Sequence, residues 1–348
     1  MNVTKIKKNG SRVNKALLLA SGLCMLTVSV SAQDAVKSSR AGTGVYEAVI
    51  NTQDGLIYVT GAGSRTNPGG ALYKIKPSDL SIVDSINLKE NPPFGIGINN
   101  KTQVAYTTNT RTNSVSAVDL KTGKVLATIK NGAEESHTRE VLVDEKNNII
   151  YVSDVGDPSN IWVIDGKTNS YSHAIGDLGK TATGMTFLNG TDKIYVSVIG
   201  DNSIYVVDVK GKKVENKFPS GGEAPVNVTS DGTRLIVANQ KSGTITVLDA
   251  KGQLIKSIPT GAGAIGVAYD AIKNRIYSAN RQTGTTTVID AKTFEVLADV
   301  STGSHPNHVK VDPKTGEAFV INKTKGGRPA EGQPVVVDQN GDTITKVN

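Results

Sequence analysis

Short runs of alternating apolar and polar residues, separated by polar turns, fill most of the chain. The clearest example starts with the apolar run 235–238 and passes through a turn that contains Lys241 and Gly243. It continues as an alternating run over residues 244–248 and closes on Asp249. Runs in which β-branched residues alternate with polar ones, bounded by turns that contain Asn, Gly and Asp, are typical of antiparallel strands. The pattern therefore predicts β-hairpins.

The closing pattern, an aliphatic residue followed by aspartate, recurs along the chain. It stands at Asp119, Asp165, Asp208, Asp249, Asp290 and Asp338, with spacings of 46, 43, 41, 41 and 48 residues. A degenerate copy without the aspartate covers residues 72–76. A period of this length with four strand-like runs per period is the signature of propeller blades. The seven copies predict an all-β fold, a single seven-bladed β-propeller with four antiparallel strands per blade.

The hydrophobic runs also predict where the individual strands lie. The first blade is expected at residues 45–50, 56–60, 71–75 and 82–88, and the second at 94–98, 104–108, 115–118 and 125–129. The inner strands of the following blades should begin near Glu140, Met185, Val226, Ile265 and Asn307.

The last blade leaves the closure of the ring open to two interpretations. Asn340-Gly341 stands between the runs 335–337 and 343–347, and Asn-Gly between alternating runs is a strong hairpin signal. We therefore expect the C-terminus to supply all four strands of this blade. The rival expectation is that residues 35–40 return as its outer strand.

The first 32 residues have the pattern of a signal peptide. Basic residues between Lys5 and Lys15 precede an apolar segment at 16–30, and small residues follow at the expected cleavage site after Ala32. The apolar segment is short for a membrane span. We expect a polar segment at 33–43, the propeller at 44–348, no membrane span after cleavage, and a periplasmic location.

Cleavage would change two properties that bear on function. Cys24, the single cysteine, would be lost, so the mature chain would have neither a disulfide nor a thiol nucleophile. Five basic and no acidic residues would also be lost, and the formal net charge would fall from +7 to +2. The overall charge therefore gives no argument for nucleic-acid binding, which must rest on where the charges lie.

Several motifs resemble a known family. Ile57-Tyr-Val-Thr, Ile150-Tyr-Val-Ser and Ile194-Tyr-Val-Ser look like YVTN-type propeller repeats. Longer landmarks are similar to YncE-type periplasmic propellers, namely Gly44-Val-Tyr-Glu47, Pro93-Phe-Gly95, Arg139-Glu140, Asn227 and His305-Pro-Asn307. The resemblance covers nearly the whole mature chain. It implies a seven-bladed, non-catalytic periplasmic protein, with single-stranded DNA binding within the family.

The charges of the loops are distributed unevenly around the predicted ring. In an up-and-down blade, the loop between strands two and three lies on the same face as the loop to the next blade. Blades three and four carry Asp154, Asp157 and Asp201 in the first of these loops. The corresponding loops of blades one, two, five, six and seven carry Arg65, Arg111, Lys241, Arg281, and then Lys323, Lys325 and Arg328. A positive arc on one face suits anion recognition, although a solvated surface would also carry such residues.

The candidate ligand-binding residues follow from this arc and from the starts of the inner strands. Tyr46 and Phe94 begin adjacent inner strands, where their rings could stack on bases. The full set is Tyr46, Arg65, Phe94, Arg111, Arg139, Lys241, Arg281, Asn307, Lys323, Lys325 and Arg328. The leading ligand is single-stranded nucleic acid or another polyanion.

Other conspicuous residues are expected to be structural. The repeat tyrosines, Tyr58, Tyr106, Tyr151, Tyr195 and Tyr277, lie mid-strand and should pack between blades, as should Trp162. The recurring aspartates should accept hydrogen bonds from turn amides. The one close histidine pair, His305 and His308, flanks Pro306, which favours an extended backbone and separates the rings. No metal site and no cofactor are expected.

Two alternatives to a binding protein stay open. A propeller enzyme of the lactonase type would need converging acid, Arg and His groups, and such residues stand near inner-strand starts at Glu47, Arg139, Glu140, Asn227 and His308. The second alternative is a scaffold that binds an envelope protein through the same face. A convergent cluster with perturbed titration would favour an enzyme, and steep salt dependence would favour a nucleic-acid binder.

Overall fold

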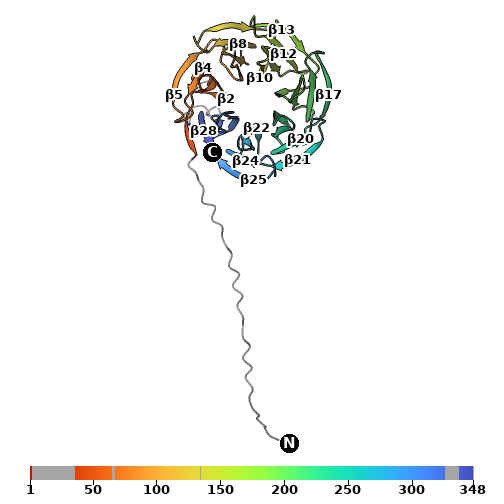
Figure 1. The fold of residues 1–348 in the computed structure, drawn as a ribbon. Coiled ribbons are helices and arrows are strands. Elements are labelled where there is room, and N and C mark those ends of the chain that lie inside the picture. Colours follow the sequence, from red (N-terminus) through yellow and green to blue (C-terminus); the bar gives the residue numbers. More distant parts are fainter. Residues whose placement is uncertain (2–35, 65–66, 134, 326–336, 348) are drawn as a thin grey trace. The chain divides into compact units, whose positions relative to one another are not determined.

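The computed structural model describes Met1 and residues 36–64, 67–133, 135–325 and 337–347. Within the unit Ala35–Asn348, these residues form seven four-stranded antiparallel sheets arranged as a ring (Figure 1). The described part of the chain contains strands and turns, and it has no helix that could cross a membrane. The predicted seven-bladed β-propeller is confirmed.

Six blades are built from four consecutive strands each. The first three blades are β2 (Val45–Ile50), β3 (Ile57–Gly63), β4 (Pro68–Ile75) and β5 (Ile82–Asn87), then β6 (Ile96–Asn99), β7 (Val104–Asn109), β8 (Ser114–Asp119) and β9 (Val125–Ile129), then β10 (Thr138–Asp144), β11 (Ile149–Asp154), β12 (Asn160–Asp165) and β13 (Ser170–Ile175).

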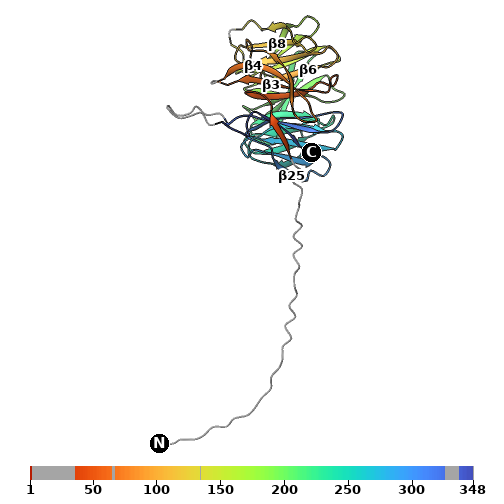
Figure 2. The ribbon, with the colours of Figure 1, turned by 90° about the vertical axis from the view of Figure 1, so that its left-hand side faces the viewer.

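The next three blades repeat this order. They are β14 (Ala182–Phe187), β15 (Lys193–Val198), β16 (Ser203–Asp208) and β17 (Lys213–Pro219), then β18 (Pro225–Ser230), β19 (Leu235–Asn239), β20 (Thr244–Leu248) and β21 (Leu254–Pro259), then β22 (Ala264–Asp270), β23 (Arg275–Asn280), β24 (Thr285–Asp290) and β25 (Val296–Ser301). In each, the first strand is innermost and the fourth outermost. Figure 2 gives the perpendicular view of this ring.

The seventh blade is closed by the N-terminal segment. Its strands from the axis outward are β26 (Pro306–Val311), β27 (Ala318–Asn322), β28 (Thr343–Val347) and β1 (Lys37–Arg40). β1 runs antiparallel to β28, and beyond it Ala41 N donates to Asp342 O at 2.9 Å. The expectation that the C-terminus supplies all four strands was therefore wrong, and the rival expectation is correct. The propeller also begins before the predicted boundary at residue 44.

The misassignment has an identifiable cause in the last blade. Asn340 and Gly341 do not join two paired strands; they belong to the turn that leads into β28, which pairs directly with β27. Asp338 does not close a third strand either. Its carboxylate accepts hydrogen bonds from Ser304 Oγ at 2.8 Å and from the Lys325 amide at 2.9 Å. Asp338 therefore anchors the loop that precedes β28.

The residues expected to be structural are buried as predicted. The five repeat tyrosines are between 0% and 3% exposed, and Trp162 is 0% exposed. Trp162 Nε1 donates to the Asp154 carboxylate at 2.9 Å. Because a blade has two apolar faces, these side chains fill the spaces between neighbouring sheets.

The recurring aspartates cap the turns that follow the third strands. At Asp119, Asp165, Asp208, Asp249 and Asp290, one carboxylate oxygen accepts a hydrogen bond from the amide two residues later, at 2.8–3.1 Å. These amide bonds lower the pKa of Asp119 and Asp290. The structural role predicted for this column is confirmed at these five positions.

Candidate anion-binding site

One end of the ring brings inner-strand starts beside the loops between second and third strands. Ala264 at the start of β22 pairs with Asn280 at the end of β23, and Pro306 in β26 pairs with Asn322 in β27. Arg281 and Lys323 follow these asparagines directly. We call the part of this end where Tyr46, Arg139, Arg281 and Lys323 lie the mouth.

Tyr46 is the residue around which the mouth is built. Lys323 Nζ lies 4.2 Å from the centroid of its ring, and the Phe94 ring meets it edge to face with centroids 5.3 Å apart. Asn307 Nδ2 donates to the backbone oxygen of Tyr46 at 2.9 Å and joins blade seven to blade one. The two aromatic rings expected at adjacent inner strands therefore form one cluster.

Arg111 covers the neighbouring ring. Its guanidinium carbon lies 5.3 Å from the Phe94 centroid, and its Nη1 donates to Ala62 O at 2.8 Å. Thr60 Oγ1 donates to the backbone oxygen of Phe94 at 2.5 Å. These bonds connect blades one and two and fix the orientation of the aromatic pair. Both rings thus have a cation beside them.

Three cations from three different blades are close enough to repel one another at the mouth. Burial, followed by the positive charges of Arg281 and Arg139, lowers the pKa of Lys323 to about 8. Burial also lowers the pKa of Arg281. Within the described residues, the single ion pair of these three cations joins Arg139 Nε to Glu140 Oε1 at 3.9 Å. The mouth therefore carries positive charge that is only partly compensated.

A pair of carboxyl groups lies next to Arg139. Glu47 is 3% exposed, and its Oε2 accepts a hydrogen bond from Ile96 N at 3.2 Å. Burial, followed by the negative charge of Glu140, holds the pKa of Glu47 well above its usual range.

Two glycines of blade two allow blade three to approach it closely. A Cβ on Gly95 would lie 1.9 Å from Arg139 O, and one on Gly97 would lie 2.7 Å from Val141 Cγ1. Because these positions carry no side chain, β10 packs closely against β6. Glu140 of β10 is thereby near enough to Glu47, which accepts from Ile96 N, to raise its pKa.

His308 and Lys310 extend the cluster along β26. His308 Nδ1 accepts a hydrogen bond from Ala48 N at 3.3 Å, and burial lowers the pKa of this histidine to about 3. Burial also lowers the pKa of Lys310, while attraction to Glu47 and Glu140 opposes that shift. Four residues of the enzyme alternative, Glu47, Arg139, Glu140 and His308, thus lie in or beside one cluster.

The remaining candidates lie away from this cluster. Lys241 is exposed and paired with Glu223 at 2.7 Å, and Lys325 is exposed beside Asp338. Asn227 lies against Gly184 in blade four. Arg65 and Arg328 fall outside the described residues.

Comparison with known proteins places the chain in a family. Residues 49–272 match the model of the YNCE-like beta-propeller family, which covers more than half of the chain. The chain belongs to the YNCE-like beta-propeller family.

Individual members of this family are moderately similar to the chain. The uncharacterized protein YncE of Escherichia coli K12 is 30% identical over 212 residues, which span 59% of this chain and 60% of that protein. YncE of Salmonella typhi is 29% identical over 258 residues, which span 67% and 72%. A chain of Kuenenia stuttgartiensis hydrazine synthase has a TM-score of 0.67 at 15% identity, covering 83% of this chain and 94% of that one. That last similarity concerns the fold alone.

Lys310 is a residue of this cluster that sequence reasoning did not select. It stands between Val309 and Val311, both buried against blade six. The sequence signal was a lysine that alternates with apolar residues in a predicted innermost strand. Such a lysine side chain has little access to bulk solvent and is therefore a candidate site residue.

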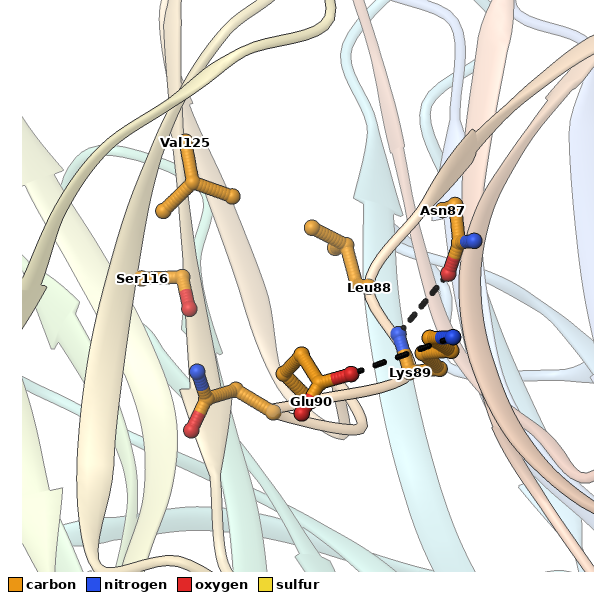
Figure 3. Close-up of a pocket in the computed structure, with 7 residues that line it drawn as sticks. Asn87, Leu88, Lys89, Glu90, Ser116 and Val125 are labelled. Carbon is orange, nitrogen blue, oxygen red and sulfur yellow. Dashed lines mark hydrogen bonds and ion pairs between the residues drawn. The ribbon is translucent and has the colours of Figure 1, made fainter.

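Two cavities lie outside the mouth. One of about 230 Å³ is lined by Asn87, Leu88, Lys89, Glu90, Asn91, Ser116 and Val125 (Figure 3). Its two charged residues are exposed and 4.0 Å apart. The other, of about 530 Å³, lies near His137 and Asp154 in blade three. The Asp154 carboxylate accepts hydrogen bonds from Trp162 Nε1 at 2.9 Å and from the His137 amide at 2.6 Å, so it has a structural role.

Proposed function

We propose that the mouth binds anions and that its ligand is single-stranded nucleic acid, without chemistry on that ligand. One observation carries the proposal: Arg139, Arg281 and Lys323 come from three blades to one place with a single long ion pair among them. Partly buried like charges destabilise the protein unless an anion accompanies them. A bound phosphate would offset that cost.

The aromatic pair supports nucleic acid among the anionic polymers. Tyr46 and Phe94 are both partly exposed at the mouth and lie edge to face. Stacking of a base on such a ring contributes about 1–3 kcal/mol and tolerates any base. We therefore expect affinity that depends little on sequence and strongly on salt.

The test is fluorescence anisotropy of a labelled single strand over a range of salt concentrations. The double change Arg111→Ala and Arg281→Ala should weaken binding and flatten the salt dependence, because each phosphate contact adds roughly −0.7 to the slope. The matched control, Lys121→Ala with Lys292→Ala, changes two lysines at the opposite end of the ring. Equal losses from both double variants would mean diffuse attraction, and absence of binding at low salt would leave the envelope-protein scaffold as the better proposal.

A single aromatic change separates stacking from charge. Phe94→Ala should lower affinity by about 1–3 kcal/mol and leave the salt slope unchanged, because the ring carries no charge. A flattened slope in this variant would instead indicate that Phe94 acts by positioning Arg111.

The carboxyl pair favours a second candidate, a hydrolase of the lactonase type. Two carboxyl groups whose pKa values differ can supply both an acid and a base; burial and the nearby Glu140 carboxyl raise the pKa of Glu47, and Glu140 lies beside Arg139. Hydrolysis of a lactone panel, followed by acid release, tests it. Turnover that disappears in Glu140→Gln would replace the non-catalytic proposal, whereas we expect no turnover.

We also propose export to the periplasm. The basic leader, apolar segment and small residues of positions 1–32 support it. Fractionation of a producing cell, with N-terminal sequencing of the product, tests both the location and the cleavage after Ala32.

A further inference from the structure

The cations at the mouth end differ sharply in whether a carboxylate accompanies them. Toward the rim, Lys180 pairs with Asp157 at 3.2 Å and Lys217 with Asp201 at 2.8 Å. At the mouth, Arg139 Nε is buried without a hydrogen-bond partner. Within the described residues, the Arg281 guanidinium has neither a hydrogen bond nor an ion pair. The uncompensated charge is concentrated near the inner strands.

This concentration suits one group of high charge better than an extended backbone. An internal phosphodiester carries one negative charge, and successive charges are spread along the strand. A phosphomonoester carries about 1.5 to 2 negative charges at pH 7 and presents three acceptor oxygens. Arginine adds planar paired donors that match phosphate oxygens.

We infer that Arg139, Arg281 and Lys323 bind a phosphomonoester, so that a nucleic-acid strand is held by its terminal phosphate. This inference rests on the proposed function and names the part of the strand that the site recognises. The strand end enters the mouth, and the rest of the strand leaves across the face.

The neighbouring side chains fit this assignment. Arg139 Nε lies 3.9 Å from Glu140 Oε1, which is longer than the roughly 2.7–2.9 Å of a close charged hydrogen bond. The carboxylate therefore orients the guanidinium and leaves its N–H donors available to a ligand. Lys323 lies 4.2 Å from the centroid of the Tyr46 ring. A phosphate held by Lys323 therefore places the first nucleoside beside Tyr46 and Phe94.

The crowding of positive charge favours a dianion over a monoanion as the ligand. Lys323 has its pKa lowered to about 8 by burial and by two arginines. A bound group with two negative charges would offset the repulsion between Lys323 and the two arginines. A diester with one negative charge would offset less of this repulsion.

The experiment compares three forms of one single-stranded oligonucleotide: with a 5′-phosphate, with a 3′-phosphate, and with both ends hydroxylated. Anisotropy with an internal label measures affinity, and competition with a nucleoside 5′-monophosphate, its nucleoside and inorganic phosphate identifies the group recognised. We expect ~10-fold tighter binding of one phosphorylated form. The monophosphate should compete, whereas the nucleoside should not.

Two variants and one control localise the effect. Arg281→Ala and Lys323→Ala should each remove the preference for a phosphorylated end, and either suffices if the other folds poorly. Lys180→Ala, at the same end but paired with Asp157, should keep it.

The outcomes separate this inference from the function on which it rests. Equal affinity for all three strands would overturn the inference and leave nucleic-acid binding in place. If the monophosphate or inorganic phosphate bound and none of the three strands did, the nucleic-acid proposal would be overturned and a small phosphate-bearing molecule would be the better ligand. Binding of none of these probes would overturn both.

Discussion

The two ends of the ring use charge in opposite ways. At one end, an aspartate recurs in five consecutive blades and accepts an amide hydrogen bond in its own turn. At the mouth, Arg139 near the start of the inner strand of blade three meets Arg281 and Lys323, which follow the buried asparagine in blades six and seven. The charge that recurs in five blades is satisfied locally and stabilises the fold. The charge at positions that are basic in only one or two blades is left without a close partner.

The largest expected effect comes from removing the strand that closes the ring. A chain that begins at Ala41 lacks β1 and its pairing with β28, and it should lose about 3–5 kcal/mol of unfolding free energy. Binding should fall as well, because the loop before β28 holds Val45 through Asp342 Oδ1 at 3.2 Å, next to Tyr46. Thermal and urea unfolding measure the first effect.

The control for this truncation keeps the backbone and removes side chains. Ser38→Ala with Ser39→Ala preserves the β1 pairing and should cost much less. Unchanged stability of the truncated chain would contradict the role of β1 in closure.

The next comparison sets a repeated residue against its unrepeated neighbour at the mouth. Asn280 is 0% exposed, and its Nδ2 donates to Thr287 Oγ1 at 2.8 Å; Asn239 makes the matching bond to Thr246 Oγ1 at 3.0 Å. Asn280→Ala should therefore lower the unfolding free energy by about 1–3 kcal/mol. Arg281→Ala should leave stability unchanged or higher, because a partly buried cation is removed, and should lose affinity.

Both variants are measured by the same urea unfolding and anisotropy experiments. Lys292→Ala, which removes an exposed cation at the opposite end of the ring, serves as the control and should change neither stability nor affinity. If Arg281→Ala destabilised the protein as much as Asn280→Ala, the division between repeated and unrepeated residues would not hold.

The same buried asparagines show why the sequence predicted six blades well and the seventh poorly. Asn322 Nδ2 donates to Thr345 Oγ1 at 2.9 Å, as Asn239 does to Thr246, and Thr343-Ile-Thr345 repeats Thr244-Ile-Thr246. The loop in the seventh blade separates partners that are seven residues apart elsewhere. Two pairs in this loop led to the wrong prediction. Val337-Asp338 has the pattern that ends the third strand in other blades, and Asn340-Gly341 has the pattern of a hairpin turn.

The sequence predicts which end of the ring a site residue lies on, because strand direction determines it. The sequence does not predict which site residues contact each other, because that depends on packing. Strand parity alone placed Arg281 and Lys323 on the same end as Tyr46. The influence of Glu140 on Glu47 depends on how closely blade three approaches blade two at Gly95 and Gly97, which no repeat period indicates. The same limit applies to Lys241, whose pairing with Glu223 depends on loop conformation.

The smallest expected effect is a pH dependence with opposite signs for binding and stability. Lys323 has a pKa of about 8 in the folded chain, below its ordinary 10.5, so it loses its proton as the pH rises through 8. Affinity for a single strand of adenine nucleotides should fall severalfold between pH 7 and pH 9.5. The unfolded chain binds more protons at this position between these two pKa values, so the contribution of Lys323 to stability should rise over the same interval. Lys323→Arg keeps its charge throughout and should flatten both trends. Affinity that declines equally in this variant would place the titrating group elsewhere in the mouth.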